Sequence, residues 1–185
     1  MNADIMSTPF LPPPPAAEEV GYDIMDSPIG RLLLTGNARA LTGLYMLDGG
    51  KHSVTVPAGQ RHEGGFPEVT TQLGEYFTGL RTEFDLALAP RGSEFQIAVW
   101  TQLTLIPFGE TASYGEVALA LGKSLLASRA VGLANGRNPI SIIVPCHRVI
   151  GADGSMTGYG GGVDRKEWLL RHEGVLDAFP ADTLW

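Results

Sequence analysis

Hydrophobic positions alternate with polar ones in the first part of the chain. Between residues 20 and 47, Leu32 and Leu34 alternate, and Leu41, Leu44 and Leu47 follow after another turn. The turn residues Ser27-Pro28-Ile29-Gly30 interrupt them. A period of two bounded by turn residues predicts antiparallel strands over this segment.

The spacing changes after residue 66. Residues 49–66 are rich in Gly, Pro and His and predict a loop. Apolar residues between 67 and 79 then follow one another at intervals of three and four, which predicts a single amphipathic helix. Residues 83–88 predict one further strand.

The second half of the chain shows helix start signals. Ser93 with Gln96, Ser113 with Glu116, and Asp164 with Glu167 each place a capping residue three positions before a partner. These signals predict helices over residues 93–106, 114–121, 125–134 and 164–173. Glycines at 122 and 174 fall where helices commonly end. Only residues 122–124 separate the second and third of these helices, which is compatible with a helix-turn-helix.

The pattern predicts an α/β (α+β) protein with a domain boundary near residue 92. A small antiparallel-sheet domain is expected over residues 20–92. A mostly helical, winged-helix-like domain with the helix-turn-helix is expected over residues 93–175. Residues 1–19 contain four consecutive prolines and predict a disordered or polyproline-like tail, and residues 176–185 form a C-terminal tail.

Charge argues against nucleic-acid binding over the whole chain but less so in its second half. The 185 residues contain 13 Lys and Arg against 20 Asp and Glu, a formal net charge of −7. Residues 1–92 hold six basic and eleven acidic residues, whereas residues 93–173 hold seven of each. Within residues 111–151, four basic residues face one acidic residue: Lys123, Arg129, Arg137 and Arg148 against Glu116. A weak local basic patch is therefore compatible with the sequence, as is ordinary scatter of charge.

The single cysteine and the hydropathy limit the cellular setting. One cysteine excludes an intrachain disulfide and a zinc site with several thiolates, so a reducing compartment is expected. No apolar run approaches the roughly 20 residues needed to cross a bilayer, and the first 20 residues lack the pattern of a secretory signal. We expect a cytoplasmic protein with no membrane partner.

That cysteine lies in the most informative segment of the chain, Ile142-Ile143-Val144-Pro145-Cys146-His147-Arg148-Val149-Ile150. An isolated cysteine is often only a small buried apolar residue. Here an imidazole and a guanidinium follow it directly, and cations and a helix start lower the pKa of a thiol. Because the thiolate is the nucleophilic form, the segment favours a nucleophilic cysteine.

Other chemistry fits less well. A zinc site is disfavoured because the histidines at 52, 62, 147 and 172 are scattered, and we expect neither a metal nor a cofactor. A cysteine protease built from Cys146, His172 and Asn138 lacks any surrounding protease signature. A redox dithiol is excluded because there is no second cysteine. Residues 122–124 resemble the end of a phosphate-binding loop but lack its earlier glycine, and the glycines around Tyr159 follow no clear strand.

Pro145-Cys146-His147-Arg148-Val149 resembles the active-site signature of the O6-alkylguanine-DNA alkyltransferases, also called methylated-DNA–protein-cysteine methyltransferases. The resemblance covers roughly residues 20–174 and is strongest from residue 93 onward. Its further motifs are Phe108-Gly109-Glu110, Ser113-Tyr114-Gly115, Arg129-Ala130-Val131-Gly132, Asn138-Pro139, Gly158-Tyr159-Gly160-Gly161-Gly162 and Lys166-Glu167-Trp168-Leu169-Leu170.

The resemblance implies a single-turnover transfer of an alkyl group from O6 of guanine, and more weakly from O4 of thymine, to a cysteine. Cys146 is then the acceptor, His147 a general base acting through a water, and Glu173 the carboxylate that orients His147. Tyr114 and Lys166 would neutralise the leaving guanine. The remaining implied roles are a polar hinge at Asn138 and an alkyl pocket lined by Ser141, Val149 and Tyr159.

The resemblance also implies binding to the minor groove of double-stranded DNA as a monomer, with the damaged nucleotide rotated out of the stack. Arg129 would fill the resulting gap, and Tyr114, Gly115 and Lys123 would contact the DNA. The segment from Gly122 to Arg129 is one residue longer than is usual in the family and lacks its proline. Two alternatives remain: a non-catalytic lesion-binding protein of the same fold, and a helix-turn-helix transcription regulator, which would read bases in the major groove.

Overall fold

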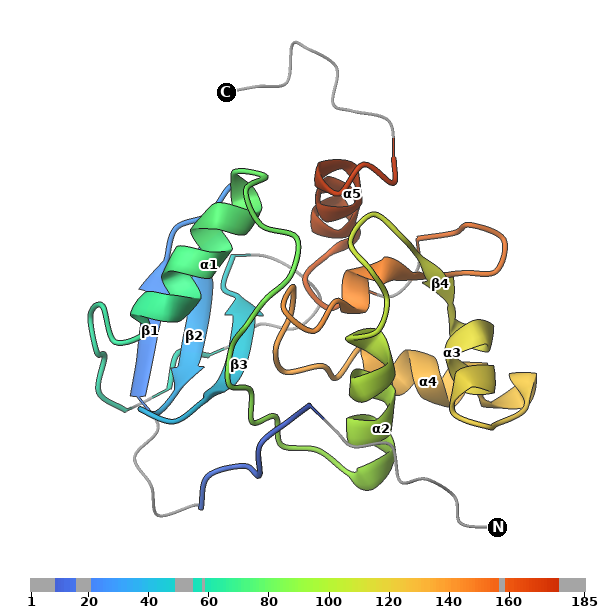
Figure 1. The fold of residues 1–185 in the computed structure, drawn as a ribbon, viewed down its shortest axis with the longest axis horizontal. Coiled ribbons are helices and arrows are strands. Elements are labelled where there is room, and N and C mark those ends of the chain that lie inside the picture. Colours follow the sequence, from blue (N-terminus) through green and yellow to red (C-terminus); the bar gives the residue numbers. More distant parts are fainter. Residues whose placement is uncertain (1–8, 16–20, 49–54, 58, 157–158, 177–185) are drawn as a thin grey trace.

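The computed structural model describes residues 9–15, 21–48, 55–57, 59–156 and 159–176. A three-stranded antiparallel sheet forms the first half, in the order β1 (Gly21–Met25), β2 (Leu32–Gly36) and β3 (Leu41–Met46) (Figure 1). Leu34 pairs with Asp23 on one side and with Leu44 on the other. Every residue of β2 is buried, because this central strand is covered on both faces.

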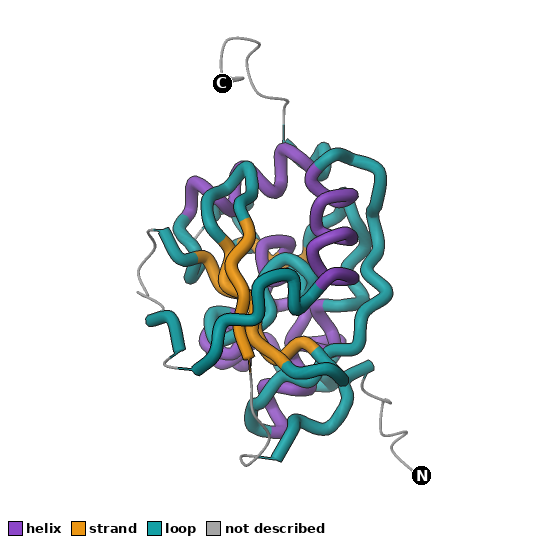
Figure 2. Tube along the Cα trace, turned by 90° about the vertical axis from the view of Figure 1, so that its left-hand side faces the viewer, coloured by secondary structure: helices purple, strands orange, loops and turns teal. Residues whose placement is uncertain are grey.

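Helix α1 (Pro67–Phe77) packs across one face of this sheet (Figures 1 and 2). Proline at its first position suits a helix start, because the missing N–H would have had no partner there. Val69, Leu73 and Tyr76 are buried at the expected helical spacing. The predicted amphipathic helix is therefore present, and it ends two residues earlier than expected.

The second half contains four α-helices: α2 (Glu94–Leu103), α3 (Tyr114–Ala120), α4 (Ser128–Asn135) and α5 (Val163–His172). Capping boxes at Ser93 and Ser113 start α2 and α3, as predicted. The prediction for Asp164 is wrong. Helix α5 begins one residue earlier, after Gly162 at φ 98°, so Asp164 lies inside the first turn and caps nothing.

Helices α3 and α4 and the segment between them form the predicted helix-turn-helix (Figure 1). Gly122 has φ 67°, a left-handed conformation that suits glycine and ends the first helix. A single 3₁₀ turn, Leu125–Ala127, precedes α4, so the α-helix begins at Ser128 and not at residue 125. The longer turn is thus accommodated in tightly wound backbone before Arg129.

Two separate segments share the outer edge of β3. The predicted strand over residues 83–88 is reduced to a single bridge between Leu41 and Leu88. The bridge at Leu88 is parallel, so residues 83–87 would have to run beside the residues that precede Leu41. Those residues form the turn between β2 and β3, and no strand is available there to pair with. Further along the edge, the Leu44 amide donates to the Pro139 carbonyl at 2.8 Å, and the Ser141 amide donates to the Leu44 carbonyl at 3.1 Å. The pairing also attaches the sheet to the segment that leads to Cys146.

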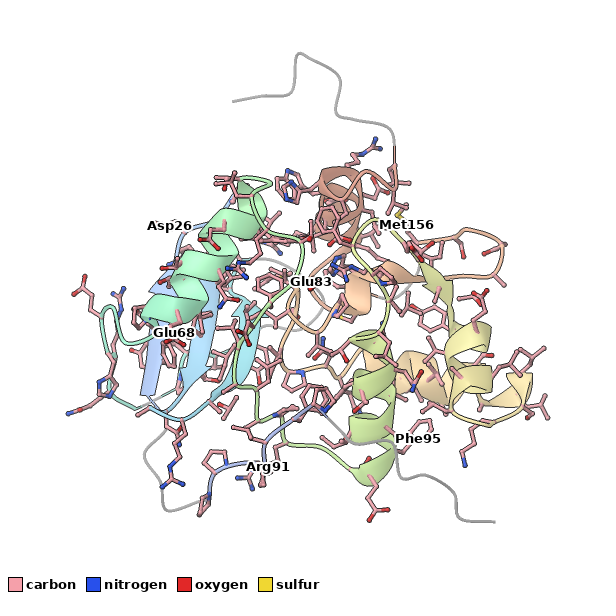
Figure 3. All side chains as sticks on the ribbon, in the orientation of Figure 1. Asp26, Glu68, Glu83, Arg91, Phe95 and Met156 are labelled. Atoms are coloured by element: carbon pink, nitrogen blue, oxygen red, sulfur yellow. The ribbon has the colours of Figure 1, made fainter. Side chains whose placement is uncertain are left out.

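One continuous hydrophobic core joins the two halves, and their side chains fill the space between sheet and helices (Figure 3). Part of the N-terminal tail contributes to it, contrary to the prediction. Phe10 is buried, the Leu11 amide donates to the Leu88 carbonyl at 2.8 Å, and Arg91 donates to the Pro14 carbonyl at 2.7 Å. The apolar Phe10 provides the anchor that the proline run lacks. The rest of the predicted tails, residues 1–8, 16–19 and 177–185, lies outside the described residues.

No helix in the described part of the chain is both long enough and apolar enough to cross a membrane.

Candidate active site

A short parallel strand pair places the cysteine beside the helix-turn-helix. Cys146–Arg148 form a 3₁₀ turn that leads into β5 (Val149–Ile150), and β5 pairs with β4 (Ala112–Ser113). Tyr114 is the next residue after β4, so the pairing brings the start of α3 to the cysteine turn. Strands of two residues leave no periodic signal, and the sequence analysis did not find them.

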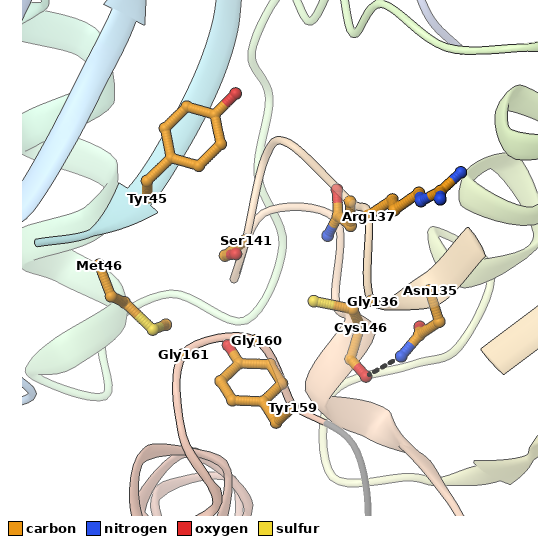
Figure 4. A pocket seen from close by; sticks show the side chains of 11 residues that line it. Tyr45, Met46, Asn135, Gly136, Arg137, Ser141, Cys146, Tyr159, Gly160 and Gly161 are labelled. Carbon is orange, nitrogen blue, oxygen red and sulfur yellow. Dashed lines mark hydrogen bonds between the residues drawn. The ribbon is translucent and has the colours of Figure 1, made fainter. Parts of the chain in front are cut away.

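Asn138 braces the segment that precedes the cysteine. Its side-chain amide donates to the Val144 carbonyl at 2.7 Å, and its side-chain oxygen accepts from the Ile140 amide at 3.0 Å. Ile142, inside this loop, has φ 71°, an uncommon and strained conformation for a β-branched residue. Asn135 adds a hydrogen bond of 3.3 Å to the Cys146 carbonyl (Figure 4). The cysteine is therefore held from both sides by amide side chains.

Glu173 is the centre of a buried cluster, although it is also the residue that follows the last residue of α5. One carboxylate oxygen, Oε1, accepts from Nε2 of His147 at 2.8 Å and from the hydroxyl of Tyr76 at 2.7 Å. The other oxygen accepts from Nε of Arg148 at 2.8 Å. Despite its burial, the hydrogen bonds from His147 and Arg148 and the Arg148 charge lower the pKa of Glu173 to about 2. An ordinary exposed carboxylate at a helix end is excluded by this geometry.

His147 is fully buried, and its partners decide which nitrogen carries the proton. An ionised carboxylate can only accept, so Nε2 donates to Glu173 and Nδ1 holds the lone pair in the neutral ring. Nδ1 is buried and has no hydrogen-bond partner among the described residues. Burial lowers the pKa of His147, and this outweighs the opposing effect of Glu173. The imidazole is therefore neutral at pH 7 and able to accept a proton.

Cys146 is 4% exposed, and burial raises the pKa of its thiol. Asn138 and Lys166 favour the thiolate, but burial has the larger effect. The expectation that neighbouring cations lower this pKa overall is therefore wrong, because the same packing that brings them close also removes water from the sulfur. The resting group is a thiol, and a base is needed to generate the nucleophile.

Lys166 is fully buried, although it lies near the start of a helix. Since α5 begins at Val163, Lys166 lies one turn inside the helix, and its Nζ donates to the Val149 carbonyl at 2.6 Å. Burial lowers the pKa of Lys166 to about 8, while interaction with Cys146 acts in the opposite direction. The amine can therefore gain or lose a proton near neutral pH.

A cavity opens at the cysteine between the sheet and the helical half (Figure 4). Ser141 and Tyr159 line it, as does Asn138. Val149 does not, since its side chain is fully buried behind the cysteine turn. Tyr45 and Met46 of β3 also line the cavity. Their part in it could not be predicted from the sequence, because β3 precedes the cysteine by about a hundred residues. The full lining is Tyr45, Met46, Asn135, Gly136, Arg137, Asn138, Ser141, Cys146, Tyr159, Gly160 and Gly161.

The residues expected to contact DNA lie on the helix-turn-helix and not in the cavity. Arg129 and Lys123 are exposed, and Tyr114 is half-buried. Gly115 is close to the turn, since a Cβ atom there would lie 3.0 Å from Leu125. The C-terminal end of α4, at Asn135 and Gly136, reaches the cavity, so the helix that carries Arg129 ends at the cysteine site.

His172 does not take part in this site. Its Nε2 lies 2.7 Å from the Tyr76 carbonyl, and its ring stacks on Trp168 with centroids 5.1 Å apart. The protease arrangement is therefore excluded, because His172 lies between α1 and α5 and away from the cysteine cavity. No group of His, Cys, Asp or Glu side chains suited to a metal ion occurs in the described part of the chain.

Two family models match this chain and together cover most of it. The first, described as 6-O-methylguanine DNA methyltransferase, ribonuclease-like domain, matches residues 20–90. The second, the DNA binding domain of the same protein, matches residues 94–175. The chain belongs to the 6-O-methylguanine DNA methyltransferase family. In these terms, Cys146, His147 and Glu173 fall in the DNA binding domain, whereas Tyr45, Met46 and Tyr76 fall in the ribonuclease-like domain.

Individual members of the family are similar over nearly their whole length. A methylated-DNA–protein-cysteine methyltransferase of Methanosarcina barkeri is 52% identical over 153 residues, which is 82% of this chain and 96% of that protein. The protein of the same name from Mycolicibacterium paratuberculosis is 53% identical over 154 residues, covering 83% and 92%. The crystal structure of Mycobacterium tuberculosis OGT in complex with DNA superposes with a TM-score of 0.78 at 51% identity, over 88% of this chain and 96% of that one.

Proposed function

We propose that this family member repairs O6-alkylguanine in duplex DNA, and O4-alkylthymine more slowly, by transferring the alkyl group to Cys146 in a single turnover. One observation carries the proposal: the only thiol of the chain lines a cavity next to a buried neutral imidazole that is fixed by a carboxylate. The names of the relatives support it, since they describe methyl transfer to a protein cysteine.

The transfer is a displacement at carbon. His147 takes the thiol proton at Nδ1 through a water, and Glu173 stabilises the imidazolium that forms. The Cys146 sulfur then forms a bond to the alkyl carbon while the bond from that carbon to O6 breaks, and the electron pair goes to the guanine. The product is a neutral thioether, and the chain holds no second thiol to remove the group. Each protein molecule therefore accepts one alkyl group.

The leaving guanine needs a proton where the negative charge develops. Tyr114 and Lys166 are the candidates, because the first lies beside the cysteine turn and the second is a buried amine that titrates near neutral pH. Burial and the interaction with Cys146 both raise the pKa of Tyr114, whereas at Lys166 the interaction with Cys146 opposes the larger effect of burial. Asn138 acts indirectly, by holding the loop through which Cys146 is presented.

Contact with the damaged base requires that it leave the duplex, because O6 is not accessible to a thiol inside the stack. We propose minor-groove binding through α3 and α4, with Arg129 filling the gap left by the extruded nucleotide and the protein acting as a monomer. Exposure of Arg129 on the helix that ends at the cavity supports this geometry. A lesion-binding protein or a transcription regulator needs no thiol with a base beside it, so both alternatives are disfavoured.

Direct reversal makes a distinct change in the DNA. After incubation with a duplex that carries one O6-methylguanine, the strand should remain intact and contain ordinary guanine, in an amount that equals the protein added and does not increase with time. Mass spectrometry of the oligonucleotide measures this. An abasic site, a broken strand or continued turnover would refute direct single-turnover repair.

Replacement of Arg129 by alanine separates DNA distortion from chemistry. Unstacking a base step costs on the order of a few kcal/mol, so loss of the side chain that fills the gap should slow duplex repair by about tenfold or more. Transfer from the free base O6-benzylguanine should be unchanged, because no base has to leave a stack. The two second-order rates are measured side by side, with Lys123→Ala as a control for loss of one exposed charge. Equal slowing on both substrates would show that Arg129 serves the fold instead.

A further inference from the structure

Tyr76 connects the first half of the chain to the catalytic cluster. It lies in α1, which packs on the sheet, and its hydroxyl donates to Oε1 of Glu173, the residue that follows α5, at 2.7 Å. Both side chains are fully or nearly fully buried, with Tyr76 at 0% and Glu173 at 4% exposure. A charge-assisted hydrogen bond removed from water in this way is a strong contact.

The hydroxyl shares its acceptor atom with the catalytic histidine. Oε1 is the oxygen that also accepts from Nε2 of His147, at 2.8 Å. Nη2 of Arg148 is a third donor to the same oxygen, at 3.1 Å. Donors that share one oxygen divide its negative charge between them, so each bond weakens the attraction of the carboxylate for the other donors. Burial and the Glu173 charge raise the pKa of Tyr76 far above its ordinary value, so the hydroxyl stays protonated and always donates.

We propose that Tyr76 is a positioning residue for the Cys146–His147–Glu173 relay, holding Oε1 against His147 while keeping the imidazole neutral until the thiol proton arrives. This inference rests on the proposed function only in assigning His147 as the base. It gives the ribonuclease-like domain a direct part in the chemistry, because the donor comes from a helix of that domain. If Glu173 stabilised the protonated imidazole too strongly, His147 would already carry a proton before the reaction and could not act as a base.

The other charged groups around His147 stay in place when the hydroxyl is removed. Lys166 in α5 and Glu173 just after α5 face it, and Arg148 follows it in the chain. Arg148 keeps both its hydrogen bonds to Glu173, through Nε and Nη2. A change in the proton affinity of His147 in Tyr76→Phe therefore reports the loss of a single donor on Oε1.

The ring of Tyr76 makes separate contacts that phenylalanine preserves. It packs edge-on against Phe108 and His172, with centroids 6.2 and 5.0 Å away, and tilted against Phe84 at 5.5 Å. These contacts need the ring and not the hydroxyl, so Tyr76→Phe keeps the packing between α1 and α5.

The test compares Tyr76→Phe with the parent protein and with Tyr22→Phe. Tyr22 lies on β1 and is not part of the Glu173 cluster. Two quantities are measured between pH 5 and 9: the rate of methyl transfer from an O6-methylguanine duplex, and the NMR titration of the His147 ring. The acid limb of each profile is the pH range in which the transfer rate falls or the His147 ring becomes protonated. In Tyr76→Phe, both acid limbs should move to higher pH by about half a unit, a threefold change in proton affinity. The rate at high pH should stay within a few-fold of the parent rate. Tyr22→Phe should match the parent in both.

The two readouts separate this inference from the proposed function. Unchanged limbs in Tyr76→Phe, with or without a lower melting temperature, would overturn the positioning role and leave Tyr76 a structural residue. If the parent transferred no methyl group, the proposed function would fail, and the NMR titration would still decide whether Tyr76 controls the protonation of His147.

Discussion

Replacement of Cys146 by serine should abolish alkyl transfer and leave binding to methylated duplex unchanged. The serine hydroxyl fits the space of the thiol but gives up its proton to His147 far less readily. We expect the transfer rate to fall by about 10⁴-fold or more, which corresponds to roughly 5 kcal/mol in the activation barrier. Transfer of a labelled methyl group and a gel-shift titration on the same duplex measure the two properties.

Comparing these two measurements distinguishes loss of the alkyl acceptor from loss of DNA binding. Because Cys146 lines the cavity while the exposed residues of the helix-turn-helix lie elsewhere, the substitution removes the acceptor and not the DNA-binding surface. Residual transfer at a rate near that of the parent would show that another atom receives the alkyl group.

Glu173→Gln should slow transfer at pH 7 by about 100-fold, a typical contribution of general-base catalysis. The amide removes the charge that stabilises the His147 imidazolium, while burial already raises the pKa of the thiol. The rate should recover substantially as the pH rises toward 9, where more of the thiol ionises without help. Glu110→Gln, at an exposed position before β4, is the matched control and should follow the parent profile. A fully folded Glu173→Gln protein that transfers methyl at the parental rate across this range would disprove the relay.

The same substitution should lower stability, because Arg148 is buried and loses its ionic partner. Removing one partner of a buried pair costs about 3–5 kcal/mol. The pKa of Glu173 is about 2 in the folded protein, below its ordinary value, so its stabilising contribution is complete above about pH 5 and is lost as the pH falls toward 2. Urea denaturation should therefore show a large difference between variant and parent at pH 7 that shrinks in acid. A lower melting temperature alone does not separate the relay from a structural role, whereas recovery of the rate at high pH does.

Local signals in the sequence predicted the elements of this fold well. The capping boxes at Ser93 and Ser113 and the left-handed glycine at 122 depend only on neighbouring residues, and all three are present. The helix-turn-helix follows from them. The prediction from Asp164 is wrong because the N-cap of α5 is Gly162, which has no side chain for a capping hydrogen bond, and the helix begins at Val163.

Local sequence signals could not predict long-range contacts. Whether residues 83–88 form a strand depends on where β3 begins, because Leu88 lies opposite Leu41, the first residue of β3, in a parallel bridge. Met46 and Tyr76 were visible only as apolar members of a strand and a helix, yet they reach the cavity and the catalytic carboxylate.

Electrostatics depended on burial in the same way. The cations near Cys146 were evident in the sequence, but the loss of water that raises its pKa was not. The burial of Lys166 was likewise not evident in the sequence. Prediction of the site residues from motifs is thus separate from prediction of their protonation, which needs the packed structure.

The acceptor atom is the central claim, and the mass of the protein tests it most directly. After complete reaction with a duplex that carries O6-methylguanine, the intact chain should gain the mass of a single methyl group replacing one hydrogen. Fragmentation of the peptide that spans residues 138–148 should place that group on Cys146 alone. A methyl group on any other residue, or an unmodified protein beside fully repaired DNA, would contradict the account.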